Sequence, residues 1–484
     1  MRDELSPEKV AAFDVLNRNR SALATLSDSI FYFGELGCQE YETCALMCKL
    51  LEADGFQIER GLSGFPTAFL ATWGSGHPVI ALHTEFDANP DNSQMSGAIA
   101  RRPIVEGAPG HCEGHNVNAA VLVATAIAVK RTLVTFGISG TLKVFGTPAE
   151  EMLLCRPYFV RDGYFDDVDA AIHDHLGGEF RTAWGVINSA LVSAKFIFSG
   201  ETAHAATAPW KARDALDAVV MMDTGFAQFR EHMRPGMRAH RVITEGGHQP
   251  NVIPARTSVW WYFRDSDAEG ARLLFERACE IARGAAQMTR TSVDINVLSA
   301  VWPVRADKGL ADVIESNIAL VGMPDWTEDE QEFARALQRQ AEVKVEGLKS
   351  EHTRVTAPAV QGASSNDSGD ITWVVPTGRL TFPSNVPNLP FHHWSAGAPL
   401  ATTIAHKGAL AGAKALAGTV IDLFTKPSLL GSIKHAFAVE RAAQPFTSLV
   451  PKDQKAPQDL NKDEMERWRP SMRAFYVKET PVFV

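Results

Sequence analysis

Polar clusters that directly follow short apolar segments place the strongest constraint on how this chain can fold. Buried strands are expected at 68–73, 79–83 and 141–145, and an Ala/Val-rich helix at 116–132. The segment 110–116 (Gly-His-Cys-Glu-Gly-His-Asn) leads into that helix, and Glu150 and Glu151 follow the strand at 141–145. In α/β folds, such side chains collect at the carboxyl ends of the strands. The sequence therefore predicts an α/β domain with a site at that edge.

The pattern changes near residue 190. Beyond it, strands are expected at 191–199, 238–244, 257–264 and 291–297, and helices at 209–229 and 269–287. This order (strand, helix, strand, strand, helix, strand) is that of a ferredoxin-like α+β unit. A chain of 484 residues is also too long for one ordinary core. We therefore expect a catalytic domain at 1–190, an inserted domain at 191–300, and a second part of the catalytic domain at 301–484 that ends in a surface tail.

Composition excludes several classes of partner. With 45% apolar and 21% charged residues, the chain has the make-up of a globular protein, and no apolar run is expected to be long enough to cross a bilayer. A net charge of −10 without basic clusters disfavours nucleic acid as a partner. The N-terminus lacks the apolar core of a signal peptide, and the six cysteines form no CxxC pair. These features predict a cytoplasmic location.

The residues at 110–116 and 146–151 suit a divalent metal ion. Imidazoles and carboxylates such as His115, Glu113 and Glu151 are the ligands that such ions bind. A further carboxylate at Glu150 would be free to move protons. The clusters therefore predict a metal-dependent hydrolase.

Eight segments, taken in order, resemble the metal-dependent aminoacylase/carboxypeptidase peptidase family, and within it the branch of the B-type subunits of aminobenzoyl-glutamate hydrolase. They are residues 80–87, 110–116, 146–151, 169–175, 200–206, 246–254, 364–373 and 391–394. The resemblance implies a mixed-sheet, zinc-peptidase-like catalytic domain, interrupted by a lid through which two or more copies associate.

The resemblance also implies roles for individual residues. A divalent ion, Mn²⁺ or Zn²⁺, would be bound by Glu113, His115, Glu151, His175 and His392. Glu150 would be the general base. His204 of the lid would reach a neighbouring active site and stabilise developing negative charge, and Asn251 would help to hold the substrate. Asp87, His173 and His393 are expected beside the ligands rather than on the metal.

Glu113 departs from the branch, in which a cysteine usually occupies this position. A carboxylate favours Mn²⁺ or Zn²⁺ over ions that prefer thiolates. The chain also resembles a relative with altered chemistry of this sort, and that resemblance implies the leading hypothesis: hydrolytic deamination of a small aromatic carboxylate, 5-nitroanthranilate, to 5-nitrosalicylate and ammonia. The departure at Glu113 favours this reaction over amide cleavage. Two alternatives stay open: hydrolysis of the amide of aminobenzoyl-glutamate or another N-acyl amino acid, and an inactive relative that only binds ligands.

Two polar segments have a simpler interpretation. Residues 364–370 are typical of a polar turn before a helix, with substrate contact as the alternative. The arginines and histidine at 234–241 are typical of a solvated strand edge, although an arginine there could attract a substrate carboxylate.

Overall fold

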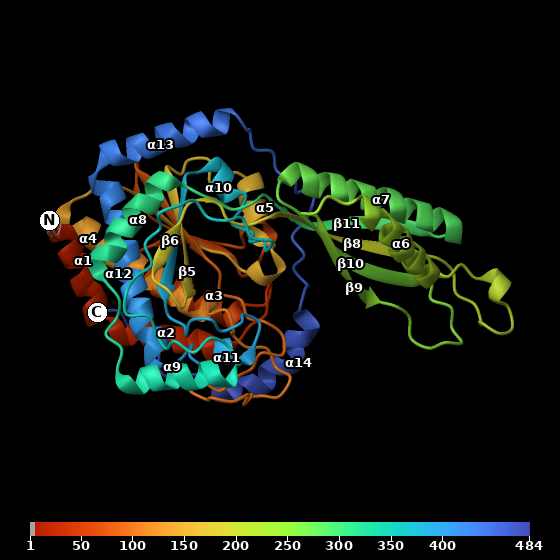
Figure 1. Cartoon of the computed structure of the whole chain (residues 1–484), viewed down its shortest axis with the longest axis horizontal. Coiled ribbons are helices and arrows are strands. Elements are labelled where there is room, and N and C mark those ends of the chain that lie inside the picture. Colours follow the sequence, from red (N-terminus) through yellow and green to blue (C-terminus); the bar gives the residue numbers. More distant parts are fainter. Residues whose placement is uncertain (1–4) are drawn as a thin grey trace.

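The computed structural model describes residues 5–484 and consists of two units (Figure 1). A seven-stranded sheet with strand order β1-β2-β4-β3-β5-β13-β6 forms the centre of the larger unit. A four-stranded sheet with order β11-β8-β10-β9 forms the smaller unit, which extends to the right of the larger one in Figure 1.

The larger sheet is mixed. Its strands are β1 (Gln57–Arg60), β2 (Phe69–Ser75), β3 (Val79–Thr84), β4 (Gly140–Gly146), β5 (Ala170–Gly177), β6 (Arg181–Ala183) and β13 (Thr377–Pro383). The four central strands, β4, β3, β5 and β13, run parallel, whereas β1, β2 and β6 are antiparallel to their neighbours. The predicted mixed α/β architecture is confirmed.

Two long helices cover one face of this sheet. Helices α4 (His115–Phe136) and α12 (Thr403–Thr425) contact each other and the strands β3, β5 and β13. Both are long and apolar enough to cross a membrane, so the expectation that no such run exists is wrong. The most apolar windows of these helices are 72% and 83% buried inside the protein, which is typical of core helices. Their apolar surface is therefore used for packing against the sheet.

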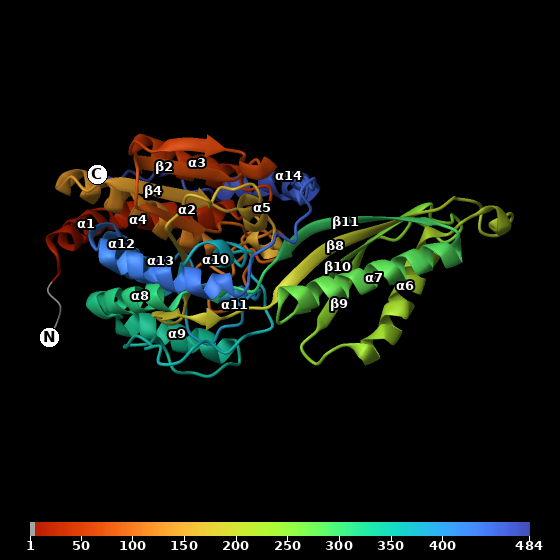
Figure 2. The same cartoon turned by 90° about the horizontal axis from the view of Figure 1, so that it is seen from above.

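The remaining helices surround this core. They are α1 (Pro7–Arg18), α2 (Arg20–Phe33), α3 (Tyr41–Ala53), α5 (Cys155–Arg161), α8 (Lys308–Val321), α9 (Glu328–Gln340), α10 (Ile371–Val374), α11 (Trp394–Gly397), α13 (Pro427–Ala442) and α14 (Lys462–Met472). In Figure 2, α8 and α9 lie on the opposite side of the larger unit from α3 and β2. The sequence did not predict α8 or the strand β13.

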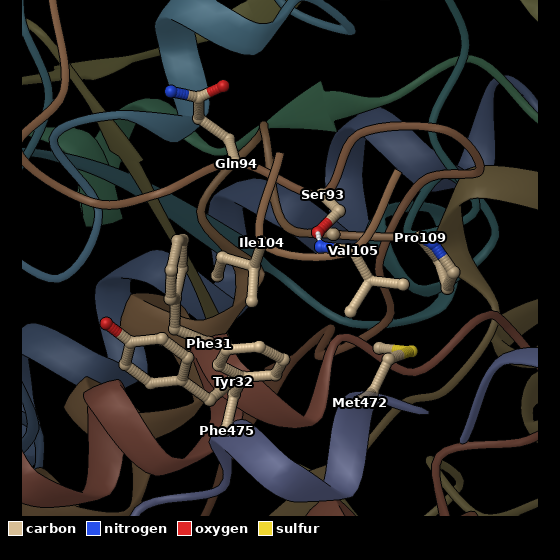
Figure 3. A pocket seen from close by; sticks show the side chains of 10 residues that line it. Phe31, Tyr32, Ser93, Gln94, Ile104, Val105, Pro109, Met472 and Phe475 are labelled. Atoms are coloured by element: carbon tan, nitrogen blue, oxygen red, sulfur yellow. Dashed lines mark hydrogen bonds between the residues drawn. The ribbon is translucent and has the colours of Figure 1, made fainter. Parts of the chain in front are cut away.

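The C-terminal segment packs on the N-terminal helices, as expected of a surface tail. Arg469 of α14 forms an ion pair with Glu35 at 2.9 Å. Figure 3 shows Met472 and Phe475 beside Phe31 at a small apolar pocket of about 20 Å³. This pocket has room for about one water molecule and is too small for a substrate.

The smaller unit has the predicted order of elements. It consists of β8 (Ala190–Ser199), α6 (Ala215–Phe229), β9 (Arg238–Glu245), β10 (Arg256–Asp265), α7 (Ala268–Thr289) and β11 (Ser292–Val301). Both helices pack on one face of the sheet, where Phe226, Trp261 and Phe263 are buried. The ferredoxin-like arrangement is thereby confirmed. The exact domain boundaries at 190 and 300 stay a prediction.

A buried carboxyl lies where the chain returns from the smaller unit to the larger one. Asp370 accepts a hydrogen bond from the backbone N–H of Trp302 at 2.9 Å, and its Oδ1 has no partner within residues 5–484. Burial raises the pKa of Asp370 from 3.8 to about 8. The folded state favours the protonated form of Asp370, so its full contribution to stability is present below the pKa that the group has in the unfolded chain. This contribution is lost as the pH rises through the pKa of the group in the folded state.

We therefore expect Asp370→Asn to be more stable than the wild type at pH 8, by about 1–3 kcal/mol in the free energy of unfolding. The advantage should shrink towards pH 5, because keeping the wild-type carboxyl protonated then costs less free energy. Urea unfolding at both pH values measures the difference, with the exposed Asp453→Asn as the control. An advantage that is equal at the two pH values would contradict the prediction.

Candidate metal centre

The centre lies at the carboxyl ends of β3, β4 and β5, where α4 begins. His115 is the first residue of α4, and Gly114 before it has φ +82°. A side chain at Gly114 would overlap Leu176, because a Cβ atom there would lie 1.5 Å from the Cδ2 atom of Leu176. Glycine is therefore required for the loop at 110–114 to turn into the helix beside β5.

All five predicted metal ligands come together in the structure. Three groups of ligand atoms each lie within 4.8 Å of one another: Glu113, Glu151 and His392; His115, Glu150 and Glu151; and Glu85, His115 and His175. Nε2 of His392 lies 3.2 Å from Oε2 of Glu151, and the rings of His115 and His175 are 5.4 Å apart. Glu85 is an additional acidic group that the ligand prediction did not contain.

Contacts at Nδ1 orient the imidazoles of His115 and His175. Nδ1 of His115 lies 3.0 Å from the backbone oxygen of Asp87 and 3.3 Å from its Oδ1 atom. Nδ1 of His175 lies 2.8 Å from the backbone oxygen of Leu176. Each ring is thus held by Nδ1 and keeps Nε2 for another partner, as metal-binding histidines usually are. Asp87 lies beside His115, as expected.

Two buried polar atoms test whether the residues suit a metal. Nε2 of His115 and Oε1 of Glu151 are buried and have no hydrogen-bond partner within residues 5–484. Buried groups of this kind are normally paired. Nitrogen and oxygen donors that converge in this way fit a divalent ion such as Zn²⁺ or Mn²⁺.

The charges at the centre depend strongly on one another. Hydrogen bonds to Glu113 and Glu151 raise the pKa of His392 to about 10. Burial, followed by the charge of Glu113, raises the pKa of Glu151. Burial acts most strongly, to raise the pKa of Glu113, but the hydrogen bond from His392 and the charges of the nearby histidines together lower it below its usual value. The carboxylates of Glu113 and Glu151 therefore both face one positively charged ring, as they would face a cation.

The backbone is strained at one ligand and at two residues that flank Glu150 and Glu151. His392 has φ +58°, and the short 3₁₀ turn Glu150–Met152 lies between Ala149 at φ +59° and Leu153 at φ +58°. Residues other than glycine rarely adopt such angles, and they cluster at functional sites. The adjacent carboxylates of Glu150 and Glu151 have different partners, Asn366 and His392.

Glu150 has a partner that the sequence did not identify. Nδ2 of Asn366 donates a hydrogen bond to Oε1 of Glu150 at 2.5 Å, and Oδ1 of Asn366 accepts from the backbone N–H of Ser368 at 2.9 Å. The polar turn at 364–370 thus positions the proposed base. Burial, followed by the charge of Glu151, raises the pKa of Glu150 well above its usual value.

A buried arginine next to the centre was also not identified from the sequence. Arg156 of α5 is fully buried and forms ion pairs with Glu85 and Asp367. Glu85 also accepts a hydrogen bond from Nε2 of His173 at 2.9 Å. An arginine next to Cys155, at the start of a helix that is mostly apolar, was the available signal. His173 lies beside the centre, as predicted.

His204 and Asn251 lie far from the centre of their own chain. Both are in loops at the distal end of the smaller sheet, where His204 bridges to Val252. The near end of that sheet carries Arg264, which pairs with Leu191 at the start of β8. The ten residues of β8 separate the two ends by about 33 Å, at ~3.3 Å per residue. These two residues are therefore too far from the centre of their own chain to contact it.

His393 and Cys112 lie near the centre but contact other groups. His393 caps α11 through its ring, which accepts from the backbone N–H of Ser395 at 3.4 Å. The thiol of Cys112 donates to Oδ1 of Asn89 at 3.0 Å, and burial raises its pKa. Neither group belongs to the metal-binding clusters found in the described residues.

A cavity of about 1100 Å³ opens onto the centre between the two units. The larger unit contributes the acidic groups, and the smaller unit contributes Arg238, His240, Tyr262 and Arg264. Nη1 of Arg264 donates to Oγ of Ser365 at 2.8 Å. The predicted solvated edge at 234–241 thus partly lines the cavity. The cavity is large enough for a small organic substrate.

Comparison with known proteins decides the family. The B-type subunit of the p-aminobenzoyl-glutamate hydrolase of Escherichia coli (strain K12) is 32% identical over 469 residues, which are 91% of this chain and 97% of that protein. The chain belongs to the metal-dependent aminoacylase/carboxypeptidase peptidase family. No family model matches the sequence.

Other relatives agree with this assignment. The Xaa-Arg dipeptidase of Mus musculus is 27% identical over 90% of this chain and 93% of its own length. The crystal structure of a dinuclear metal binding peptidase from the M20 family, from Bacillus subtilis, superposes with a TM-score of 0.54 at 16% identity. It covers 85% of this chain and 99% of that one, and it shows the same fold.

Family membership makes this protein a metal-dependent C–N hydrolase, as its ligand residues predicted. The names of the relatives correct the leading hypothesis on the reaction. They describe the cleavage of an amide or a dipeptide and therefore favour the amide-hydrolysis alternative over the deamination of 5-nitroanthranilate.

Proposed function

We propose that the protein hydrolyses the amide bond of an N-acyl amino acid, with aminobenzoyl-glutamate as the first substrate to test. The observation that carries the proposal is the position of Glu150. It is a buried carboxylate that lies within 4.8 Å of the ligand atoms of His115 and Glu151 and is held by Asn366. A general base of this kind contributes roughly 10²–10⁴-fold to a rate.

The metal ligands and Glu150 have different roles in the proposed amide hydrolysis. A bound divalent ion, held by Glu113, His115, Glu151, His175 and His392, would polarise the amide carbonyl and make water more acidic. Glu150 takes the proton of the attacking water on its carboxylate. Its raised pKa then suits it to return that proton to the departing nitrogen.

Substrate binding would involve the smaller unit. Arg264 has no carboxylate among its hydrogen-bond partners in the described chain, and its guanidinium faces the cavity, where it can bind the carboxylate of the amino acid. His204 and Asn251 of a second copy would complete the site, with His204 donating to the developing oxyanion. The proposal thus includes a dimer formed through the smaller unit, in the cytoplasm.

Deamination of 5-nitroanthranilate is the second candidate. It is favoured by Glu113, which stands where the branch usually has a cysteine. The same base and metal would serve it, with water attacking the ring carbon and ammonia leaving.

The test is a set of direct assays on the Zn²⁺- and Mn²⁺-loaded protein. We expect release of glutamate from aminobenzoyl-glutamate, or of the amino acid from a panel of N-acyl amino acids and dipeptides. Ammonia release from 5-nitroanthranilate without any amide cleavage would overturn the proposal in favour of the second candidate. No turnover of any of these compounds by metal-loaded protein would contradict both.

A further inference from the structure

Arg379 stands on the sheet face that carries the metal centre. It is the third residue of β13, where it pairs with His173 of β5 on one side and with Ala183 of β6 on the other. Thr381, two residues later, pairs with His175. Side chains of directly paired residues project from the same face of a sheet, and neighbouring strands lie about 4.8 Å apart. Arg379 is therefore one strand away from the ligand His175 and lines the same cavity.

The guanidinium of Arg379 lacks a partner of its own. Its Nη1 atom is buried and has no hydrogen-bond partner within residues 5–484. Arg156, by contrast, is paired with both Glu85 and Asp367. Burial lowers the pKa of Arg379, although the charges of Glu85 and Glu150 oppose this effect.

The nearby carboxylates are already engaged. Glu85 is bound by Arg156 and His173, and Glu150 is bound by Asn366. A buried charge without a partner destabilises a protein, so its presence needs another explanation. Arginine offers a planar pair of donors that matches the two oxygens of a carboxylate.

We propose that Arg379 determines specificity by binding a carboxylate of the substrate against the wall of the cavity formed by β13. The reaction itself rests on the proposed function, which Arg379 narrows to acidic substrates. Arg264 lines the same cavity from the smaller unit, so the cavity has arginines on two different walls. A dicarboxylic N-acyl amino acid such as an N-acyl glutamate fits this arrangement.

Binding is measured with three probes of nearly equal shape: aminobenzoyl-glutamate and its two monoamides, aminobenzoyl-glutamine and aminobenzoyl-isoglutamine. Titration calorimetry on the metal-loaded Glu150→Gln protein gives each Kd without turnover. Adding Arg379→Gln should weaken aminobenzoyl-glutamate roughly ten- to hundredfold, which corresponds to one charged hydrogen-bonded pair. One of the two monoamides lacks the carboxylate that Arg379 binds. For that monoamide, Arg379→Gln should weaken binding by about threefold or less.

Two further variants complete the design. Arg379→Lys should recover part of the affinity, because it retains the charge but not the planar donors. Arg305→Gln is the matched control, since it removes one arginine outside the cavity, where Glu440 pairs with it. The melting temperature of Arg379→Gln should equal or exceed that of the wild type. A structural role would lower it.

The outcomes separate the two proposals. Equal losses for all three probes, or no loss for aminobenzoyl-glutamate, overturn the role of Arg379 and leave the proposed function intact. If the Kd values change as expected but the wild type hydrolyses none of the three probes, the proposal of amide hydrolysis is overturned for these probes. The role of Arg379 in binding a carboxylate is supported in that case. If none of the three probes binds, the role of Arg379 is overturned, and the panel of N-acyl amino acids and dipeptides decides the proposed function.

Discussion

Replacing Glu150 by glutamine is expected to lower kcat for the amide substrate roughly 10²–10⁴-fold, because the variant cannot take a proton from water. Glutamine has the same shape, and its side-chain oxygen can still accept the hydrogen bond from Asn366. Steady-state kinetics together with metal analysis by mass spectrometry measure the effect. We expect the metal content to equal that of the wild type, because Glu150 is proposed to transfer a proton and not to bind the metal.

The control for this variant is Glu106→Gln, which alters an exposed carboxylate that pairs with Arg101. Its kcat should match that of the wild type. If Glu150→Gln turned over substrate within about threefold of the wild type while fully loaded with metal, another group would have to be the base. A loss of metal in Glu150→Gln would instead move Glu150 into the ligand set.

Arg156→Met is expected to lower the free energy of unfolding by about 3–5 kcal/mol, because it leaves the buried carboxylates of Glu85 and Asp367 without their shared partner. The methionine fills similar space, so the effect reports the lost charge rather than a cavity. Urea unfolding measures it. Arg272→Met, at an exposed ion pair with Glu269, should have a much smaller effect.

A compensating variant tests the cause. Adding Glu85→Gln and Asp367→Asn to Arg156→Met removes the uncompensated charges, and most of the lost stability should return. If the triple variant stays as unstable as Arg156→Met, packing and not charge explains the loss.

Much of the fold could be predicted because its pattern is local. In the smaller unit, strands such as β10 alternate between buried and partly exposed residues, so the order of its elements is readable from the sequence. The strand β13 was missed. Its sequence Thr-Gly-Arg-Leu-Thr-Phe-Pro follows Pro376 and looks like a polar break, although Leu380 and Phe382 alternate with Arg379 and Thr381.

The site could be predicted only in part, for a related reason. The five ligand residues lie in recognisable motifs, and the structure brings them together. Asn366 and Arg156 were not assigned, because their partners are distant in the chain. Asn366 lies 216 residues from Glu150, and Arg156 lies 71 residues from Glu85. No sequence spacing indicates such contacts, which arise only when strands far apart in the chain become neighbours.

The central claim is that imidazoles and carboxylates from separate segments bind one divalent centre. Anomalous diffraction at the zinc edge, from crystals of the Zn²⁺-loaded protein, tests it most directly. We predict a peak about 2.0–2.2 Å from Nε2 of His115 and from a carboxylate oxygen of Glu151, with His175 or His392 completing the shell. Crystals whose zinc peaks all lie away from these side chains would contradict the account.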